Sequence, residues 1–98
     1  MIDDYFRPRV VAGVDQKGRP TSVALLREMM RFRELEQRSL DLSTAAPPEV
    51  IGSAHLCAGQ DAVPVGALAG LREADQIIAT YRKHGWALAS GLSLAEVF

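Results

Sequence analysis

Two short segments of the chain carry the side chains best suited to chemistry. In the first, Tyr81 and Arg82 follow the apolar run 77–79, with Thr80 between them and the run. A short apolar run is consistent with a buried strand, and polar groups at the carboxyl end of a strand in an α/β layer usually hold ligands. Arg is the side chain best shaped to bind two phosphate oxygens at once. The pattern therefore predicts an anion-binding site at Tyr81 and Arg82.

The second segment, residues 52–62, is rich in glycine and polar side chains and contains His55. An imidazole beside an anion site can donate a proton or a hydrogen bond near neutral pH. Taken alone, a single loop histidine is more often structural than catalytic, and Arg82 could equally pair with a surface carboxylate. We expect Cys57 to be a small packed side chain, since no general base is in view to make it a nucleophile.

The bulk composition narrows the class of protein. With 98 residues, 48% of them hydrophobic, the chain can form one small domain with a core. The net charge of −1 gives no field that would attract nucleic acid or an anionic membrane, so neither partner is expected. A single cysteine excludes an internal disulfide, and the N-terminus lacks the apolar region of a secretory signal. We therefore expect a cytoplasmic location.

The chain divides into an N-terminal arm, residues 1–21, and a second region, residues 22–98. In the arm we expect a turn at 15–18 and a short extended piece at 10–12. A helix is predicted from Ser22 to about Leu42, capped by Thr21 or Ser22, with an apolar stripe at helical spacing. Its charges are mixed in sign, which favours a solvated face made of Arg27, Glu28, Arg31, Arg33, Glu34, Glu36 and Arg38.

The elements that must position the candidate site come later in the chain. A second helix is predicted from Gln60 to Leu71, with Gln60 and Asp61 as caps and a nearly bare face that another backbone can approach, formed by Ala62, Gly66 and Gly70. A strand from Gln76 to Tyr81, a turn at His84-Gly85 and a short helix from Trp86 to Ser90 follow. Ser93 and Glu96 have the spacing of a capping box, which predicts the start of a further helix.

One short strand cannot make a sheet. The strand–helix order implies a parallel sheet whose other strands are missing, and the helix announced at Ser93 has about one turn before Phe98. We therefore expect an α/β fold that is completed against another polypeptide.

The residues of both segments resemble those of a known family, the α subunit of thiamine-diphosphate-dependent 2-oxo acid dehydrogenases, of the pyruvate dehydrogenase E1 α type. The similar stretches are the opening helix at 25–36, His55-Leu56-Cys57-Ala58-Gly59-Gln60-Asp61-Ala62, Asp75-Gln76-Ile77-Ile78-Ala79-Thr80-Tyr81-Arg82-Lys83-His84-Gly85, and Gly91-Leu92-Ser93. The resemblance covers about residues 22–98. It implies the mostly helical N-terminal portion of a thiamine-diphosphate-binding fold, with the parallel sheet completed by another chain.

The resemblance also implies roles for single residues. Tyr81 and Arg82 would bind the diphosphate of thiamine diphosphate, and His55 would lie on the substrate side as a catalytic residue. The family's Gly-Asp-Gly motif, which holds Mg²⁺, does not occur in the sequence. The resemblance therefore implies that the metal ligands come from a partner chain and that the cofactor-activating glutamate comes from a β-like subunit.

Our interpretation is a split E1 α-like subunit of a 2-oxo acid dehydrogenase, an oxidoreductase that is inactive alone. Its expected partners are a chain with the rest of the E1 α-like domain, an E1 β-like subunit, a lipoyl acyltransferase and a 2-oxo acid substrate. The alternatives are a non-catalytic assembly or regulatory remnant, a fragment of a longer enzyme, and a subunit of an acetoin dehydrogenase or ketol-transferring thiamine enzyme.

Overall fold

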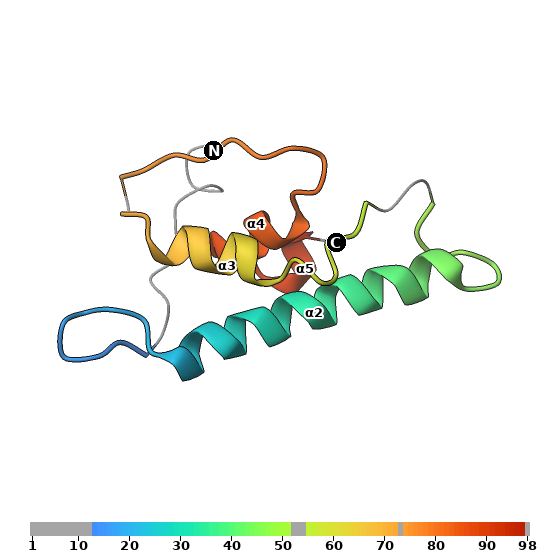
Figure 1. Cartoon of the computed structure of the whole chain (residues 1–98). Coiled ribbons are helices and arrows are strands. Elements are labelled where there is room, and N and C mark those ends of the chain that lie inside the picture. The colour runs from blue at the N-terminus through green and yellow to red at the C-terminus, as the bar shows by residue number, and fades with distance from the viewer. Residues whose placement is uncertain (1–12, 52–54, 73, 98) are drawn as a thin grey trace.

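The structure, a computed structural model, describes residues 13–51, 55–72 and 74–97. Four helices occur in this part of the chain: α2 (Ser22–Thr44), α3 (Ala62–Ala69), α4 (His84–Ala89) and α5 (Leu94–Val97). Helix α2 is the longest, and the three shorter helices lie on one side of it (Figure 1). Both α3 and α4 contact α2, and α4 also contacts α3 and α5. The candidate site is therefore built on a small helical cluster with α2 as its base.

Helix α2 begins and ends at signals that are local in the sequence. The Thr21 hydroxyl accepts a hydrogen bond from the Ala24 N–H at 3.2 Å, which confirms the predicted cap. Near the other end, three hydroxyls donate to carbonyls one turn back, those of Ser39, Ser43 and Thr44. The helix runs two residues beyond the predicted end at Leu42, and proline then excludes its continuation.

The described part of the arm folds back onto the start of α2. The Asp15 carbonyl accepts from the Gly18 N–H at 3.0 Å, which confirms the predicted turn, and Val14 forms an antiparallel bridge with Pro20. The Arg19 and Lys17 N–H groups donate to the Asp15 carboxylate and hold its pKa below the ordinary value. The extended piece predicted at 10–12 lies outside the described residues.

The hydrophobic core lies where α2 meets α4 and the segment after residue 55. It consists of Phe32, Leu35, Cys57 and Leu88, with Val97 packed against it. Cys57 is buried, as predicted. Gly85 lies so close to Phe32 that a Cβ built on it would be 2.5 Å from the ring. The predicted turn at His84-Gly85 is therefore wrong: the first turn of α4 begins there, pressed against α2.

The small-residue face of the second helix is not used as predicted. Helix α3 is shorter than expected, and a Cβ built on Gly66 would meet nothing within 4 Å. Within the part of the chain that the structure describes, the close backbone approach occurs at Gly85 instead. Asp61 stands at the N-cap position of α3 without a side-chain capping bond, so its predicted capping role is also wrong.

The strand predicted from Gln76 to Tyr81 is not formed among the described residues. Residues 75–80 have no regular secondary structure, although half-buried and exposed positions alternate along them. Figure 1 shows this segment, in orange, arching away from α2. A strand is defined by hydrogen bonds to a neighbouring strand, and residues 13–51, 55–72 and 74–97 supply none. The described fold is therefore helical, and the sheet of the expected α/β fold stays a prediction.

The capping box at the last helix is confirmed. The Ser93 N–H donates to the Glu96 carboxylate at 2.7 Å, and the Glu96 N–H donates to the Ser93 hydroxyl at 3.3 Å. The bond from the Ser93 N–H is the main cause that lowers the pKa of Glu96. None of the helices that the structure describes is long and apolar enough to cross a bilayer.

Candidate functional site

The structure brings the three predicted site residues together, although 26 positions separate the first from the second. The rings of His55 and Tyr81 meet edge to face, with centroids 4.6 Å apart and planes at 60°. The guanidinium carbon of Arg82 lies 5.9 Å from the centroid of the Tyr81 ring. An imidazole, a phenol and a guanidinium therefore form one surface group, to which two separate segments contribute.

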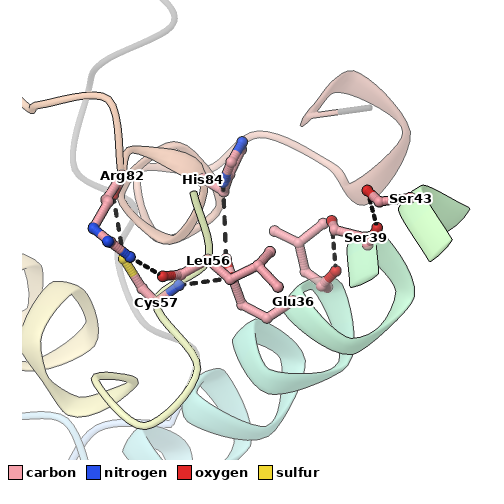
Figure 2. Close-up of polar contacts among 8 residues, drawn as sticks. Glu36, Ser39, Ser43, Leu56, Cys57, Arg82 and His84 are labelled. Atoms are coloured by element: carbon pink, nitrogen blue, oxygen red, sulfur yellow. Dashed lines mark hydrogen bonds and ion pairs between the residues drawn. The ribbon is translucent and has the colours of Figure 1, made fainter. Parts of the chain in front are cut away.

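Two hydrogen bonds join the segments behind this group. The Arg82 guanidinium donates to the carbonyl of Leu56, and the Cys57 thiol donates to the carbonyl of Arg82 at 3.7 Å (Figure 2). Each segment thus contributes one side chain that donates a hydrogen bond to a backbone carbonyl of the other segment. These two bonds therefore hold the segments next to one another, close to His55 and Tyr81.

Glu36, which the charge pattern predicts to lie on a solvated face, is at the centre of this arrangement. Glu36 is only 1% exposed, and its Oε2 accepts a hydrogen bond from the Cys57 N–H at 2.8 Å. Its Oε1 lies 3.9 Å from Nδ1 of His84. Figure 2 shows the carboxylate of Glu36 between the Cys57 backbone and the His84 ring. For Glu36 the predicted solvated face is wrong, because the charge pattern along α2 does not show which loop packs on it.

Arg33, one turn away on α2, is exposed as predicted, but it also makes a contact that the charge pattern does not show. Its guanidinium forms a two-point ion pair with the carboxylate of Asp61, which is buried at the start of α3. This pairing raises the pKa of Arg33 above its ordinary value, chiefly through the hydrogen bond. It also explains why Asp61 does not cap α3. Arg33 and Glu36 together hold the two ends of the turn that connects Cys57 to Asp61.

The exposed side of the site has groups suited to an anionic ligand. Tyr81 is 66% exposed, and Arg82 and His55 are also exposed. A phenol hydroxyl and a guanidinium both donate hydrogen bonds to phosphate oxygens, and only part of the Arg82 fork is used on Leu56. No cluster of three or more metal-ligating side chains occurs in the described ranges. The exposed donors of Tyr81 and Arg82 therefore suit an anionic ligand.

Comparison with known proteins places the site in a family context. The model of the family described as dehydrogenase E1 component matches residues 27–98. The α subunit of the pyruvate dehydrogenase E1 component of Rhizobium meliloti is 42% identical over 71 residues. The testis-specific mitochondrial form from Rattus norvegicus is 36% identical over 90 residues, and the human somatic form is 33% identical over the same length. No solved structure matches the chain.

The match covers most of this chain but a small part of each relative. It spans 72% of the chain and 20% of the Rhizobium protein, and 84% of the chain and 22% of the rat protein. The region matched by the family model, residues 27–98, includes Tyr81, Arg82, His55 and Glu36. The chain thus corresponds to about a fifth of the length of these relatives.

Proposed function

This chain belongs to the dehydrogenase E1 component family, and we propose that it supplies one side of a thiamine diphosphate site in an enzyme similar to pyruvate dehydrogenase E1 α. The supporting observation is the meeting of His55, Tyr81 and Arg82 on one exposed surface, although they come from two segments. The family match alone shows that the chain contains these residues, but it does not show that they lie close together. Their proximity makes a shared ligand geometrically possible.

The diphosphate end of the cofactor is assigned to Tyr81 and Arg82. The guanidinium supplies permanent positive charge and directed N–H groups, and the phenol supplies an O–H donor. Because Arg82 also donates to the Leu56 carbonyl, its position is partly fixed before a ligand arrives. This reduces the side-chain freedom that is lost on binding.

His55 is assigned to the substrate side. Its ring packs against the edge of Tyr81, so a ligand held by the phenol would bring its neighbouring part toward the imidazole. There the imidazole would donate a hydrogen bond or a proton to a developing negative charge on a 2-oxo acid. Thiamine diphosphate, when bound, supplies the electron sink for decarboxylation.

The rest of such a site has to come from polypeptide other than the described residues. An E1 β-like subunit, the Mg²⁺ ligands and the remaining strands of the sheet are expected to complete it. Whether they belong to a longer form of this chain or to separate chains is part of the proposal to be tested. A lipoyl acyltransferase as acceptor and a cytoplasmic location also stay predictions.

The deciding experiment is purification of the chain from its native source with the proteins bound to it. Mass spectrometry would identify the partners, and calorimetry would measure thiamine diphosphate binding in the presence of Mg²⁺. We expect Arg82→Ala to weaken this binding by roughly tenfold or more, as expected for loss of a charge-assisted contact. The matched control is Arg38→Ala, which removes an exposed arginine on α2.

Unchanged affinity in the Arg82→Ala assembly would refute the assignment of the diphosphate to Arg82. An assembly that forms with its partners but binds no thiamine diphosphate would contradict the enzymatic proposal. That second result would favour the alternative of a non-catalytic assembly protein.

A further inference from the structure

The most unusual buried group in the described structure is the carboxylate of Glu36. A carboxylate removed from water loses its hydration, and burial is unfavourable unless hydrogen bonds or a cation replace that hydration. Glu36 receives one such bond, from the Cys57 N–H at 2.8 Å. Among the described residues its Oε1 has no hydrogen-bond partner. A second donor is needed to account for the burial.

The group closest to supplying that donor is His84. Its Nδ1 is also buried without a hydrogen-bond partner in the described part of the chain, and it faces Glu36 Oε1 at 3.9 Å. A small rotation of either side chain brings the two atoms into hydrogen-bond range. Each group thus provides what the other lacks. The carboxylate accepts, and the Nδ1–H of the imidazole donates.

The two partners of Glu36 belong to the two segments of the candidate site. Cys57 lies two residues after His55, and His84 lies two residues after Arg82. The segments are already joined by the bonds from Arg82 to Leu56 and from the Cys57 thiol to the Arg82 carbonyl. Glu36 adds a contact to each segment from a third element, helix α2 (Figure 2).

We propose that Glu36 is a positioning residue that holds the His55 segment and the Arg82 segment in register through the Cys57 N–H and the His84 ring. It does not touch the ligand. It sets the distance between the imidazole on one segment and the phenol and guanidinium on the other. The identity of the ligand rests on the function proposed above, whereas the geometry of the contact does not.

One spectroscopic property separates this role from a general contribution to folding. In the neutral His84 ring, donation to a carboxylate requires the proton on Nδ1. In Glu36→Gln the amide oxygen can keep the bond from the Cys57 N–H while the amide N–H donates to Nδ1. The proton of the ring then moves to Nε2. A glutamate that merely fills space would leave the His84 tautomer unchanged.

The tautomer can be read by ¹⁵N NMR of the full chain, or of its native assembly, with labelled histidine at about pH 8, where imidazoles are mostly neutral. The sequence has two histidines, so a His55→Gln variant assigns the His84 signals. We expect an Nδ1–H tautomer in the unmodified protein and an Nε2–H tautomer in Glu36→Gln. The same tautomer in both proteins would overturn the proposal.

Ligand binding provides the second readout, in the assembly that co-purifies with the chain. We expect Glu36→Leu to weaken thiamine diphosphate binding by roughly tenfold, because a buried N–H and a buried ring nitrogen lose their partner. Glu36→Gln should stay within about threefold, since it retains both contacts. The control Glu34→Leu changes an exposed glutamate of the same helix and should have no effect.

Wild-type affinity in an assembled Glu36→Leu protein would also overturn the proposal. If Glu36→Leu does not assemble, the tautomer of His84 in the Glu36→Gln protein still tests the proposal. If the unmodified assembly binds no thiamine diphosphate, the proposed function fails, but the tautomer experiment needs no cofactor and tests Glu36 independently.

Discussion

The residues of the candidate site differ in how far the sequence around them predicts their role and position. Tyr81 and Arg82 were found as a pair because they are adjacent and follow an apolar run. The structure adds that Tyr81 touches His55, so the phenol has two tasks. Its ring packs against the imidazole, and its hydroxyl is the donor that we propose for a ligand.

These two tasks can be separated by Tyr81→Phe. The variant keeps the edge-to-face contact with His55 but removes the O–H donor. We expect thiamine diphosphate affinity in the native assembly to fall by roughly fivefold to tenfold, as for loss of one hydrogen bond to a charged group. Calorimetry measures this, with Thr80→Ala as the control at the exposed neighbouring position. Equal affinities for Tyr81→Phe and the unmodified protein would exclude a phosphate contact from the hydroxyl.

The sequence singled out Tyr81, Arg82 and His55, which the structure brings together, but it wrongly placed Glu36 on a solvated face. The reason is physical. An isolated helix with arginines and glutamates interspersed is most stable with all of them in water. Only the tertiary fold shows that the segment from Cys57 to Asp61 covers one turn of α2 and buries Glu36 there.

Secondary-structure elements were predictable where their signals are local. Thr21 and the pair Ser93 and Glu96 define helix starts through bonds within one turn, and both starts are confirmed. The start of α4 was missed because Gly85 lies in its first turn, and mid-helix glycine is normally unfavourable. Packing against Phe32 explains the glycine, and a neighbour 53 positions away is not visible in a local pattern.

The contact between α4 and α2 leads to a stability prediction. Gly85→Ala places a methyl group against the Phe32 ring, so it should destabilise the fold by about 1–3 kcal/mol, as for overpacking of a core. The matched control is Gly66→Ala in α3, where a Cβ meets nothing and alanine should stabilise the helix by up to about 1 kcal/mol. Thermal and urea unfolding measure both changes. A Gly85→Ala protein as stable as Gly66→Ala would contradict the close packing.

The capping box at α5 predicts a pH effect. The pKa of Glu96 is lower in the folded state than in the unfolded state, mainly because the Ser93 N–H donates to its carboxylate. Its stabilising effect is therefore complete above the ordinary glutamate pKa of roughly 4.3 and is lost as the pH falls through the lower, folded value. Glu96→Gln should then be less stable than the unmodified protein at neutral pH, and the difference should shrink on acidification. Unfolding curves at several pH values test this, with the exposed Glu34→Gln as the control; a difference that does not vary with pH would contradict it.

At the scale of the whole molecule, the helices and residues 76–80 differ in whether the described residues supply the contacts that stabilise them. Helices α2 and α4 contribute to a common core, whereas residues 76–80 have no regular secondary structure and Ile78 is fully exposed. Alternating burial along this segment is the pattern of a strand, but a strand also needs a partner. The predicted strand is therefore not formed among the described residues, and its completion by a neighbouring strand stays a prediction.

Hydrogen exchange can test this difference. In the chain alone, the amides of residues 77–80 should exchange without protection, while those of α2 between Phe32 and Glu36 should be protected by the helix and the core. When the chain is assembled with its native partners, protection should extend to 77–80, because a neighbouring strand would accept their hydrogen bonds. Protection of these amides in the isolated chain would show instead that their hydrogen bonds are formed without a partner.

The pairing of Arg33 with Asp61 and of Glu36 with Cys57 has a consequence for where this chain can accept inserted residues. Each residue inserted into a helix rotates everything after it by about 100°. One residue added between Arg33 and Glu36 would turn one of the two side chains away from the loop while the other stayed in place. Insertions and deletions should therefore be tolerated after Thr44, where the helix has ended, but not within this single turn of α2.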